Sequence, residues 1–163
     1  MPKTTDEILT DVMENEGGSQ VTNDPHDGGG RTQYGISERS NPEAWADGKV
    51  TEEEARAIFT QKYVNSPGFH QVQDDALRAQ LIDFGVNSGP GTAIQKLQEI
   101  LHVTVDGQLG PKTLAALHLR RGDEVGNLLV AARVRMLGRI VTKNPSQLKW
   151  LNGWLDRTLQ FIG

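Results

Sequence analysis

The chain has 163 residues, contains no cysteine and carries a net charge of −4. This length suits one domain, or one domain with a small additional lobe, and it needs no disulfide or structural metal to complete a core. Without cysteine, disulfide frameworks, zinc–thiolate sites and thiol nucleophiles are excluded. The charge is uneven: residues 1–110 hold 8 basic and 18 acidic side chains, and residues 111–163 hold 9 and 3. The basic end suits an anionic polymer or, equally, a solvated helix face.

The N-terminal segment turns acidic at Asp6 and Glu7 and has no apolar stretch of the kind that signal peptides contain. No apolar run approaches the length that spans a bilayer. We therefore expect no signal peptide and no stable membrane insertion. A substrate outside the cytoplasm would require another factor to carry the protein there.

The first predicted helix begins at a capping box, Thr4-x-x-Glu7, and ends at Gly17-Gly18. Its apolar residues follow at helical spacing: Ile8, Leu9, Val12 and Met13. Glu14 and Glu16 fall in the last turn. The next segment, residues 17–35, has six glycines and cannot be helical. We predict short strands around Val21 and Thr32–Tyr34, joined by a turn at Asp27-Gly28.

The rest of the chain is predicted to be helical. We expect six further helices. One begins at a second capping box, Thr51-x-x-Glu54, and two others begin at Pro111 and Pro145. The remaining three span residues 74–87, 92–101 and 123–142. The longest one carries an apolar stripe, Leu128, Ala132, Met136 and Ile140, and the last one carries Leu148, Leu151, Leu155 and Leu159. Trp150 and Trp154 lie beside that face and suit either packing or a sugar platform. The fold class is mainly α with a small N-terminal β-hairpin region.

Glu16 is the strongest catalytic candidate. A carboxyl group at the C-terminal end of a helix faces the negative end of the helix dipole, which favours its protonated form. Partial burial against Met13 would act in the same direction. A general acid must be protonated before it can donate. Gly17 and Gly18, which come next, would let a polymer approach closely.

An aspartate across the glycine-rich turn can supply the second carboxylate of a glycosidase, and Thr32 can hold the attacking water. A separation of roughly 6.5–9.5 Å between the two carboxyl groups would leave room for that water and invert the product. Asp24 and Asp27 both fit, and both also fit turn residues that cap their own backbone. His26 is a lone loop histidine, so we expect no metal site and no cofactor.

The segment resembles a known family. Glu16-Gly17-Gly18, followed by Asn23-Asp24-Pro25-x-Asp27-x-Gly29-Gly30-x-Thr32-x-Tyr34-Gly35-Ile36-Ser37, is similar to the signature of glycoside hydrolase family 108, bacterial and phage N-acetylmuramidases with a lysozyme-like fold. Asp83–Gly89 resembles the family's Asn-Ser-Gly helix end. Residues 93–114 resemble its C-terminal, predicted peptidoglycan-binding portion. Ser19 departs from the family, which usually has tyrosine there.

The resemblance implies Glu16 as catalytic acid, with Asp27 and Thr32 as its partners. It implies substrate contacts at five further positions: Gly17, Gly18, Tyr34, Gly35 and Asn87. A helix-end role is the alternative for Asn87. The chain divides into a catalytic region over residues 1–90 and a helical, peptidoglycan-binding-like region over 91–163, packed into the same globule.

The expected function is that of an endolysin, a monomer that hydrolyses the β-1,4 bond between N-acetylmuramic acid and N-acetylglucosamine in peptidoglycan. It would stay in the host cytoplasm until a holin or another membrane-permeabilising protein releases it to the wall. A lytic transglycosylase and a non-catalytic wall-binding module are the alternatives. Nucleic acid is not an expected partner, because the front two-thirds is acidic and contains no recognised motif.

Overall fold

The computed structural model describes residues 3–23 and 30–163. Within them lie the helices α1 (Thr5–Asn15), α2 (Glu52–Thr60), α3 (Asp75–Ser88), α4 (Pro90–Leu101), α5 (Pro111–His118), α6 (Gly122–Lys143) and α7 (Leu148–Leu159). A π-helical turn (Gln61–Asn65) follows α2, and 3₁₀ turns lie at Phe69–Gln71 and Pro145–Gln147. Two short antiparallel strands, β1 (Thr32–Gln33) and β2 (Ile36–Ser37), form the sheet. The prediction of a mainly α fold with a small hairpin is confirmed.

The helix starts follow from local chemistry. Thr4 and Thr51 both form complete capping boxes, in which the threonine hydroxyl accepts from the third helical amide and the glutamate there accepts from the cap backbone. The Asp74 side chain accepts from the Leu77 amide at the start of α3. Pro90 and Pro111 occupy first positions of α4 and α5, where the missing amide costs nothing.

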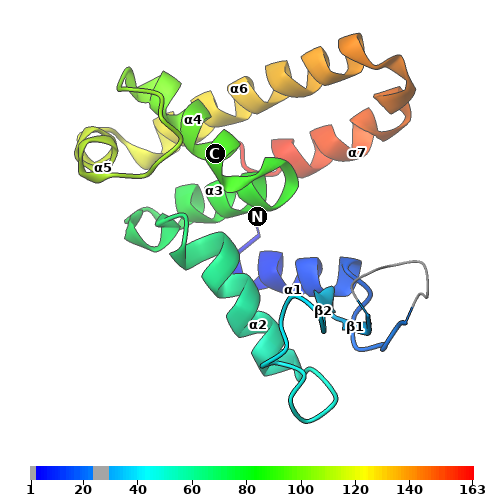
Figure 1. The fold of residues 1–163 in the computed structure, drawn as a ribbon. Helices are drawn as coiled ribbons and strands as arrows, with labels where there is room; N and C mark the ends of the chain where they lie inside the picture. The colour runs from blue at the N-terminus through cyan, green and yellow to red at the C-terminus, as the bar shows by residue number, and fades with distance from the viewer. Residues whose placement is uncertain (1–2, 24–29) are drawn as a thin grey trace.

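Helix α3 runs through the middle of the molecule (Figure 1). On one side of it lie α1, α2 and the hairpin, and on the other lie α4, α5 and the antiparallel pair α6 and α7. The core is one cluster that draws on both halves of the chain. Its fully buried side chains include Ile8, Leu81, Phe84, Leu97 and Leu129. Burial across α3 therefore joins the two regions into one folded unit.

The buried face of α6 differs from the predicted stripe. Leu128 and Ile140 are exposed, and the face that packs inward consists of Val125, Gly126, Leu129, Val130, Arg133 and Leu137. The prediction failed because a helix with apolar residues on two neighbouring stripes does not reveal which stripe its neighbours cover. On α7, Leu148 and Leu159 are exposed for the same reason. In the described part of the chain, no helix is long and apolar enough to cross a membrane.

Candidate active site

Glu16 is the residue that ends α1. Its amide donates to the carbonyl oxygen of Val12 at 3.0 Å, and it forms the C-cap of the helix. The four buried residues of α1 fix the helix to the core, and so fix where this cap lies. The Glu16 side chain is exposed, so the expected partial burial against Met13 is wrong. The helix-end position itself is as predicted.

Gly17 and Gly18 reverse the chain after Glu16. Both have positive φ angles, 104° and 58°. The Gly18 amide donates to the Met13 carbonyl and the Gly17 amide donates to the Glu14 carbonyl, the two hydrogen bonds of a Schellman motif. The glycines are therefore required by backbone geometry. A Cβ at either position would have no neighbour within 4 Å, so this side of the turn is open.

The hairpin turn is formed by Tyr34 and Gly35. Gln33 pairs with Ile36, which leaves two residues between the strands, and both have positive φ angles, 52° and 75°. This is the pattern of a type I′ turn. The Tyr34 amide donates to the Gly18 carbonyl at 2.9 Å. That hydrogen bond ties the hairpin turn to the segment that leaves α1.

The turn lies against the candidate acid. A Cβ built on Gly35 would be 2.6 Å from the Glu16 Cβ and 3.1 Å from a carboxylate oxygen of the same side chain. Only a residue without a side chain allows this approach. The structure thus brings Glu16 and Gly35 together, and the backbone of the turn forms one wall beside the carboxyl group.

Thr32 lies in the middle of the small sheet. It pairs with Ser37 of β2, and it exchanges two backbone hydrogen bonds of 2.8 Å with Thr22 on its other side. The predicted strand around Val21 is therefore a single bridge at Thr22, and the true partner strand, Ile36–Ser37, was not predicted. Thr32 is half-buried on the same hairpin as Gly35. No described contact tests its proposed role in holding water.

Four side chains that sequence reasoning did not single out hold the hairpin in place. Gln33 donates from its side-chain amide to the Ser19 carbonyl and accepts from the Val50 amide. Arg31 donates twice to Glu38 and lies over the Trp45 ring. The Arg31 guanidinium also holds the pKa of Glu38 below its usual value. The sequence offered one hint of these contacts, which is the position of Arg31 directly after three glycines.

Two other candidates are not brought to Glu16 by the described contacts. The exposed Asn87 lies within the last turn of α3 and donates from its side-chain amide to the Asp83 carbonyl four residues earlier, whereas the C-cap of that helix is Gly89. Asp27, the predicted second carboxylate, lies outside the described residues, as does Asp24. The hairpin therefore supplies the described part of the site.

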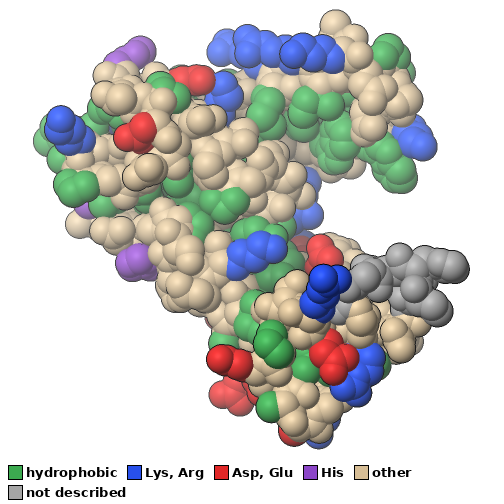
Figure 2. Space-filling view, viewed as in Figure 1, with side chains coloured by type: hydrophobic (Ala, Val, Ile, Leu, Met, Phe, Trp, Pro, Cys, Tyr) green, Lys and Arg blue, Asp and Glu red, His purple; other side chains and the backbone are tan. Residues whose placement is uncertain are grey.

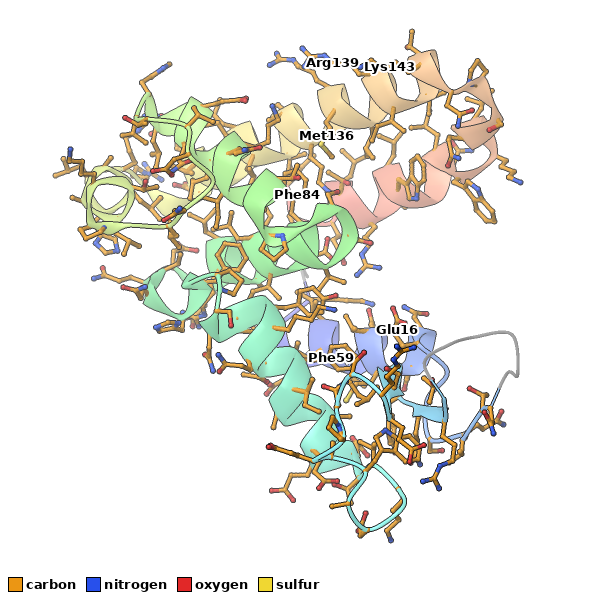
Figure 3. The ribbon with its side chains drawn as sticks, viewed as in Figure 1. Glu16, Phe59, Phe84, Met136, Arg139 and Lys143 are labelled. Atoms are coloured by element: carbon orange, nitrogen blue, oxygen red, sulfur yellow. The ribbon has the colours of Figure 1, made fainter. Side chains whose placement is uncertain are left out.

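A hollow separates the lobe that carries Glu16 from the α6–α7 pair (Figure 2). Glu16 lies at the end of α1, below α7 in the same view (Figure 3). Deeper in, a pocket is lined by Asp11, Glu14 and Asn15 of α1 together with Arg157 of α7. The two lobes thus form opposite walls of one cleft, and Glu16 is at its border.

The comparisons with known proteins fit this geometry. The family model described as Glycosyl hydrolase 108 matches residues 9–89, which include Glu16 and the whole hairpin. Residues 9–89 belong to the glycosyl hydrolase 108 family. Directly after this glycosyl hydrolase 108 region, a model described as "Predicted Peptidoglycan domain" matches residues 92–159.

A solved structure, "Structure of Brucella abortus SagA", is also similar to this chain. It covers 96% of this chain and 94% of its own, with 28% identity and a TM-score of 0.61. No curated protein matches. The family matches give an N-terminal catalytic and C-terminal peptidoglycan-binding layout, and the protein is a peptidoglycan-degrading glycoside hydrolase.

Proposed function

We propose that the protein is an N-acetylmuramidase with Glu16 as its general acid. It would cleave the β-1,4 bond between N-acetylmuramic acid and N-acetylglucosamine in peptidoglycan. The observation that carries the proposal is the placement of Glu16, an exposed carboxyl group on a rigid helix cap, pressed against the Gly35 backbone at the border of a cleft. A polymer can reach such a group from the open side of the Gly17-Gly18 turn.

In the proposed reaction, the Glu16 carboxyl group donates its proton to the glycosidic oxygen as the bond to the anomeric carbon breaks. A water molecule adds to the positively charged anomeric carbon and loses its proton to a carboxylate. We assign that carboxylate to Asp27 and the positioning of the water to Thr32, because both belong to the run that the family signature contains.

The test is mass spectrometry of the fragments released from purified sacculi in ¹⁸O-labelled water. Hydrolysis places one ¹⁸O on a new N-acetylmuramic acid reducing end. Glu16→Gln keeps the shape of the side chain but cannot donate the proton, so its rate should fall at least about 10²-fold. Glu53→Gln is the control, because it removes an exposed carboxyl group on α2 that does not line the cleft pocket, and it should retain full activity.

Other products would identify other activities. Unlabelled 1,6-anhydro ends would indicate a lytic transglycosylase, and a new N-acetylglucosamine reducing end would indicate a glucosaminidase. Binding to sacculi without any released fragment would indicate a wall-binding module. Equal losses for Glu16→Gln and Glu53→Gln would contradict the assignment of Glu16.

The second carboxylate needs its own comparison. Asp27→Asn should lower the rate more than Asp24→Asn, because only Asp27 lies in the Asp-x-Gly-Gly-x-Thr run. Thr32→Ala should cost less than Glu16→Gln, since Thr32 transfers no proton. Small and equal losses at both aspartates would favour a mechanism with Glu16 as the only essential carboxyl group.

We also propose the biological role of an endolysin, a monomer held in the host cytoplasm until a holin or a similar factor opens the membrane. Supporting it is the nature of the substrate, since a wall-cleaving enzyme is harmless on the cytoplasmic side of an intact membrane. Cells expressing the protein should keep their turbidity, then clear within minutes when chloroform permeabilises the membrane. Clearing without chloroform would contradict the role.

A further inference from the structure

Helix α7 carries two tryptophans that its packing against α6 does not fully bury. Trp150 is 55% exposed, and Trp154 is half-buried. The third tryptophan, Trp45, is buried in the lobe of the hairpin. Large exposed aromatic side chains are costly to leave in water, and they are enriched where a protein contacts a ligand or partner.

The direction of Trp150 follows from its distance along the helix from Arg157. Arg157 faces α1, because it lines the same pocket as Glu14 and Asn15. Seven residues are nearly two helical turns, so Trp150 is rotated by only about 20° from Arg157 and displaced by about 10 Å along the axis. Trp150 therefore lies on the side of α7 that faces α1.

That displacement leads toward Glu16. Helix α1 ends and α7 begins on the same side of the molecule (Figure 1). Moving back along α7 from Arg157 to Trp150 thus follows the same direction as moving past Asn15 to Glu16. The hollow of Figure 2 lies between these two elements. Trp150 is on the wall of the cleft opposite the candidate acid.

A buried ion cluster fixes this wall. The Asp83 carboxylate on α3 is fully buried and accepts from Arg133 of α6 and from Arg157 of α7, both at 2.7 Å. Charged hydrogen bonds of this length are strong and directional. Three helices are thereby joined two turns away from Trp150. The indole is presented from a rigid element, which limits the entropy lost when a ligand binds.

We propose that Trp150 is a glycan-binding residue of the catalytic cleft, where its indole stacks on a sugar ring of the strand that Glu16 cleaves. This inference rests on the proposed function. One face of a pyranose ring presents C–H groups, which suit the apolar face of an indole. The Lys149 ammonium, 5.1 Å from the Trp150 ring, is placed to pair with carboxylates of the lactyl group or stem peptide. The C-terminal region would then complete the substrate cleft instead of binding the wall at a remote site.

The charge distribution favours a glycan over a membrane surface. A helix that lies on anionic lipid needs its cations and apolar side chains around one interface. Lys149 lies beside Trp150, but the exposed cations Arg139 and Lys143 project from the far side of α6, away from α7 and the hollow (Figure 3). Trp150 faces the concave side instead. A polymer strand fits a concave wall, whereas a bilayer does not.

The test measures binding of a soluble, uncrosslinked glycan strand to the full-length Glu16→Gln protein, which does not consume the ligand. Adding Trp150→Ala should raise Kd about ten-fold, the loss expected of one aromatic contact. Trp150→Phe keeps a ring and should stay within about three-fold of the parent. Leu148→Ala is the matched control. Leu148 is a similarly exposed residue on the same helix, but it is rotated by about 180° from Arg157.

The same substitutions in the active protein give a second measurement. Trp150→Ala should raise KM for the glycan and leave kcat nearly unchanged, because the contact is remote from the breaking bond. An unchanged melting temperature shows that the exposed residue has no structural role. If Trp150→Ala binds and cleaves like Leu148→Ala while the wild type is active, the inference is wrong.

Two further outcomes would also overturn it. Loss of binding to phosphatidylglycerol vesicles in Trp150→Ala, with glycan affinity retained, would assign the tryptophan to a membrane surface. A wild-type protein that releases no fragments from sacculi would refute the proposed function, and this inference with it. The activity of the wild type therefore separates the two failures.

Discussion

The two sides of the cleft are held in place by different kinds of interaction. Around the candidate acid, position is set by a Schellman motif after α1, a two-residue turn and main-chain hydrogen bonds, together with polar contacts of the Gln33 and Arg31 side chains. Among the described residues from Glu16 to Ser37, only Ile36 is buried. The opposite wall, α6 and α7, is held by apolar burial and by the Asp83 ion cluster. Catalytic geometry therefore depends on residues that contribute little to stability, and stability depends on residues remote from the chemistry.

The strongest test of this difference is to cut the chain between the two family matches, which removes the opposite wall and its share of the core. A fragment of residues 1–89 would expose the fully buried Leu81, Ile82 and Phe84 of α3. Loss of this shared core should abolish folding. Circular dichroism during heating should show no cooperative transition for the fragment and a clear one for the full chain. A fragment that melts cooperatively would make the two regions independent.

The next largest effect is expected at the buried carboxylate. Asp83→Asn leaves Arg133, which is 4% exposed, without a counter-charge, and should lower the free energy of unfolding by about 3–5 kcal/mol. Denaturant titration measures this change. Asp75→Asn is the control, because its ion pair with Arg78 is on the surface and contributes about 0–1 kcal/mol. Similar losses for both variants would remove the distinction between the two kinds of ion pair.

Gly35→Ala should produce the reverse imbalance, a large loss of activity with a small loss of stability. The added methyl group would lie 2.6 Å from the Glu16 Cβ, so the backbone of the turn or of the Glu16 cap must shift, and we expect the rate to fall about 10–100-fold. Unfolding should become easier by only about 1 kcal/mol. Gly138→Ala is the control: this glycine is in α6 with no neighbour within 4 Å, so alanine should stabilise the helix by up to about 1 kcal/mol.

An unaltered rate in Gly35→Ala would mean that the Glu16 position tolerates displacement. In that case the contact between the hairpin and the acid would be incidental, and backbone geometry would not control the chemistry. Normal melting with low activity is the result that supports the comparison.

The smallest effect is expected on the outer face of α6. Arg133 is buried and bonded to Asp83, and Arg120 and Arg121 pair with Glu124 and Asp123, so the basic residues of the C-terminal region do not form one continuous wall-binding patch. Replacing the exposed Arg139 and Lys143 with glutamine should weaken binding to sacculi less than about ten-fold at physiological salt, where exposed charges are screened within about 8 Å. Pelleting assays at several salt concentrations measure it. If wild-type binding to sacculi falls steeply with salt and this dependence is lost in the variant, Arg139 and Lys143 do form a wall-binding patch.

Sequence reasoning recovered the parts of the structure that depend on local chemistry. The capping boxes at Thr4 and Thr51 and the proline at the start of α5 place helix ends within one or two residues. The position of Glu16 at the end of α1 followed from Gly17 and Gly18. These signals act over four residues or fewer, so no knowledge of the fold is needed.

Features that depend on tertiary contacts were not recovered. The hairpin turn was missed because Tyr34-Gly35 differs from the usual Asn-Gly or Asp-Gly pair. The buried stripe of α6 could not be chosen without knowing where α3, α4 and α7 lie. Asp83 and Arg133 are 50 positions apart, so their ion pair leaves no local pattern in the chain.

The left-handed backbone at Tyr34 has a consequence for protein engineering. Asparagine or glycine adopts this conformation at least cost, so a stabilisation effort guided by turn statistics would replace the tyrosine first. The ring, however, packs against the core beside the site, and the same replacement would empty that space. At residue 34, a substitution that relieves backbone strain is therefore expected to make the site beside it less rigid and to lower activity.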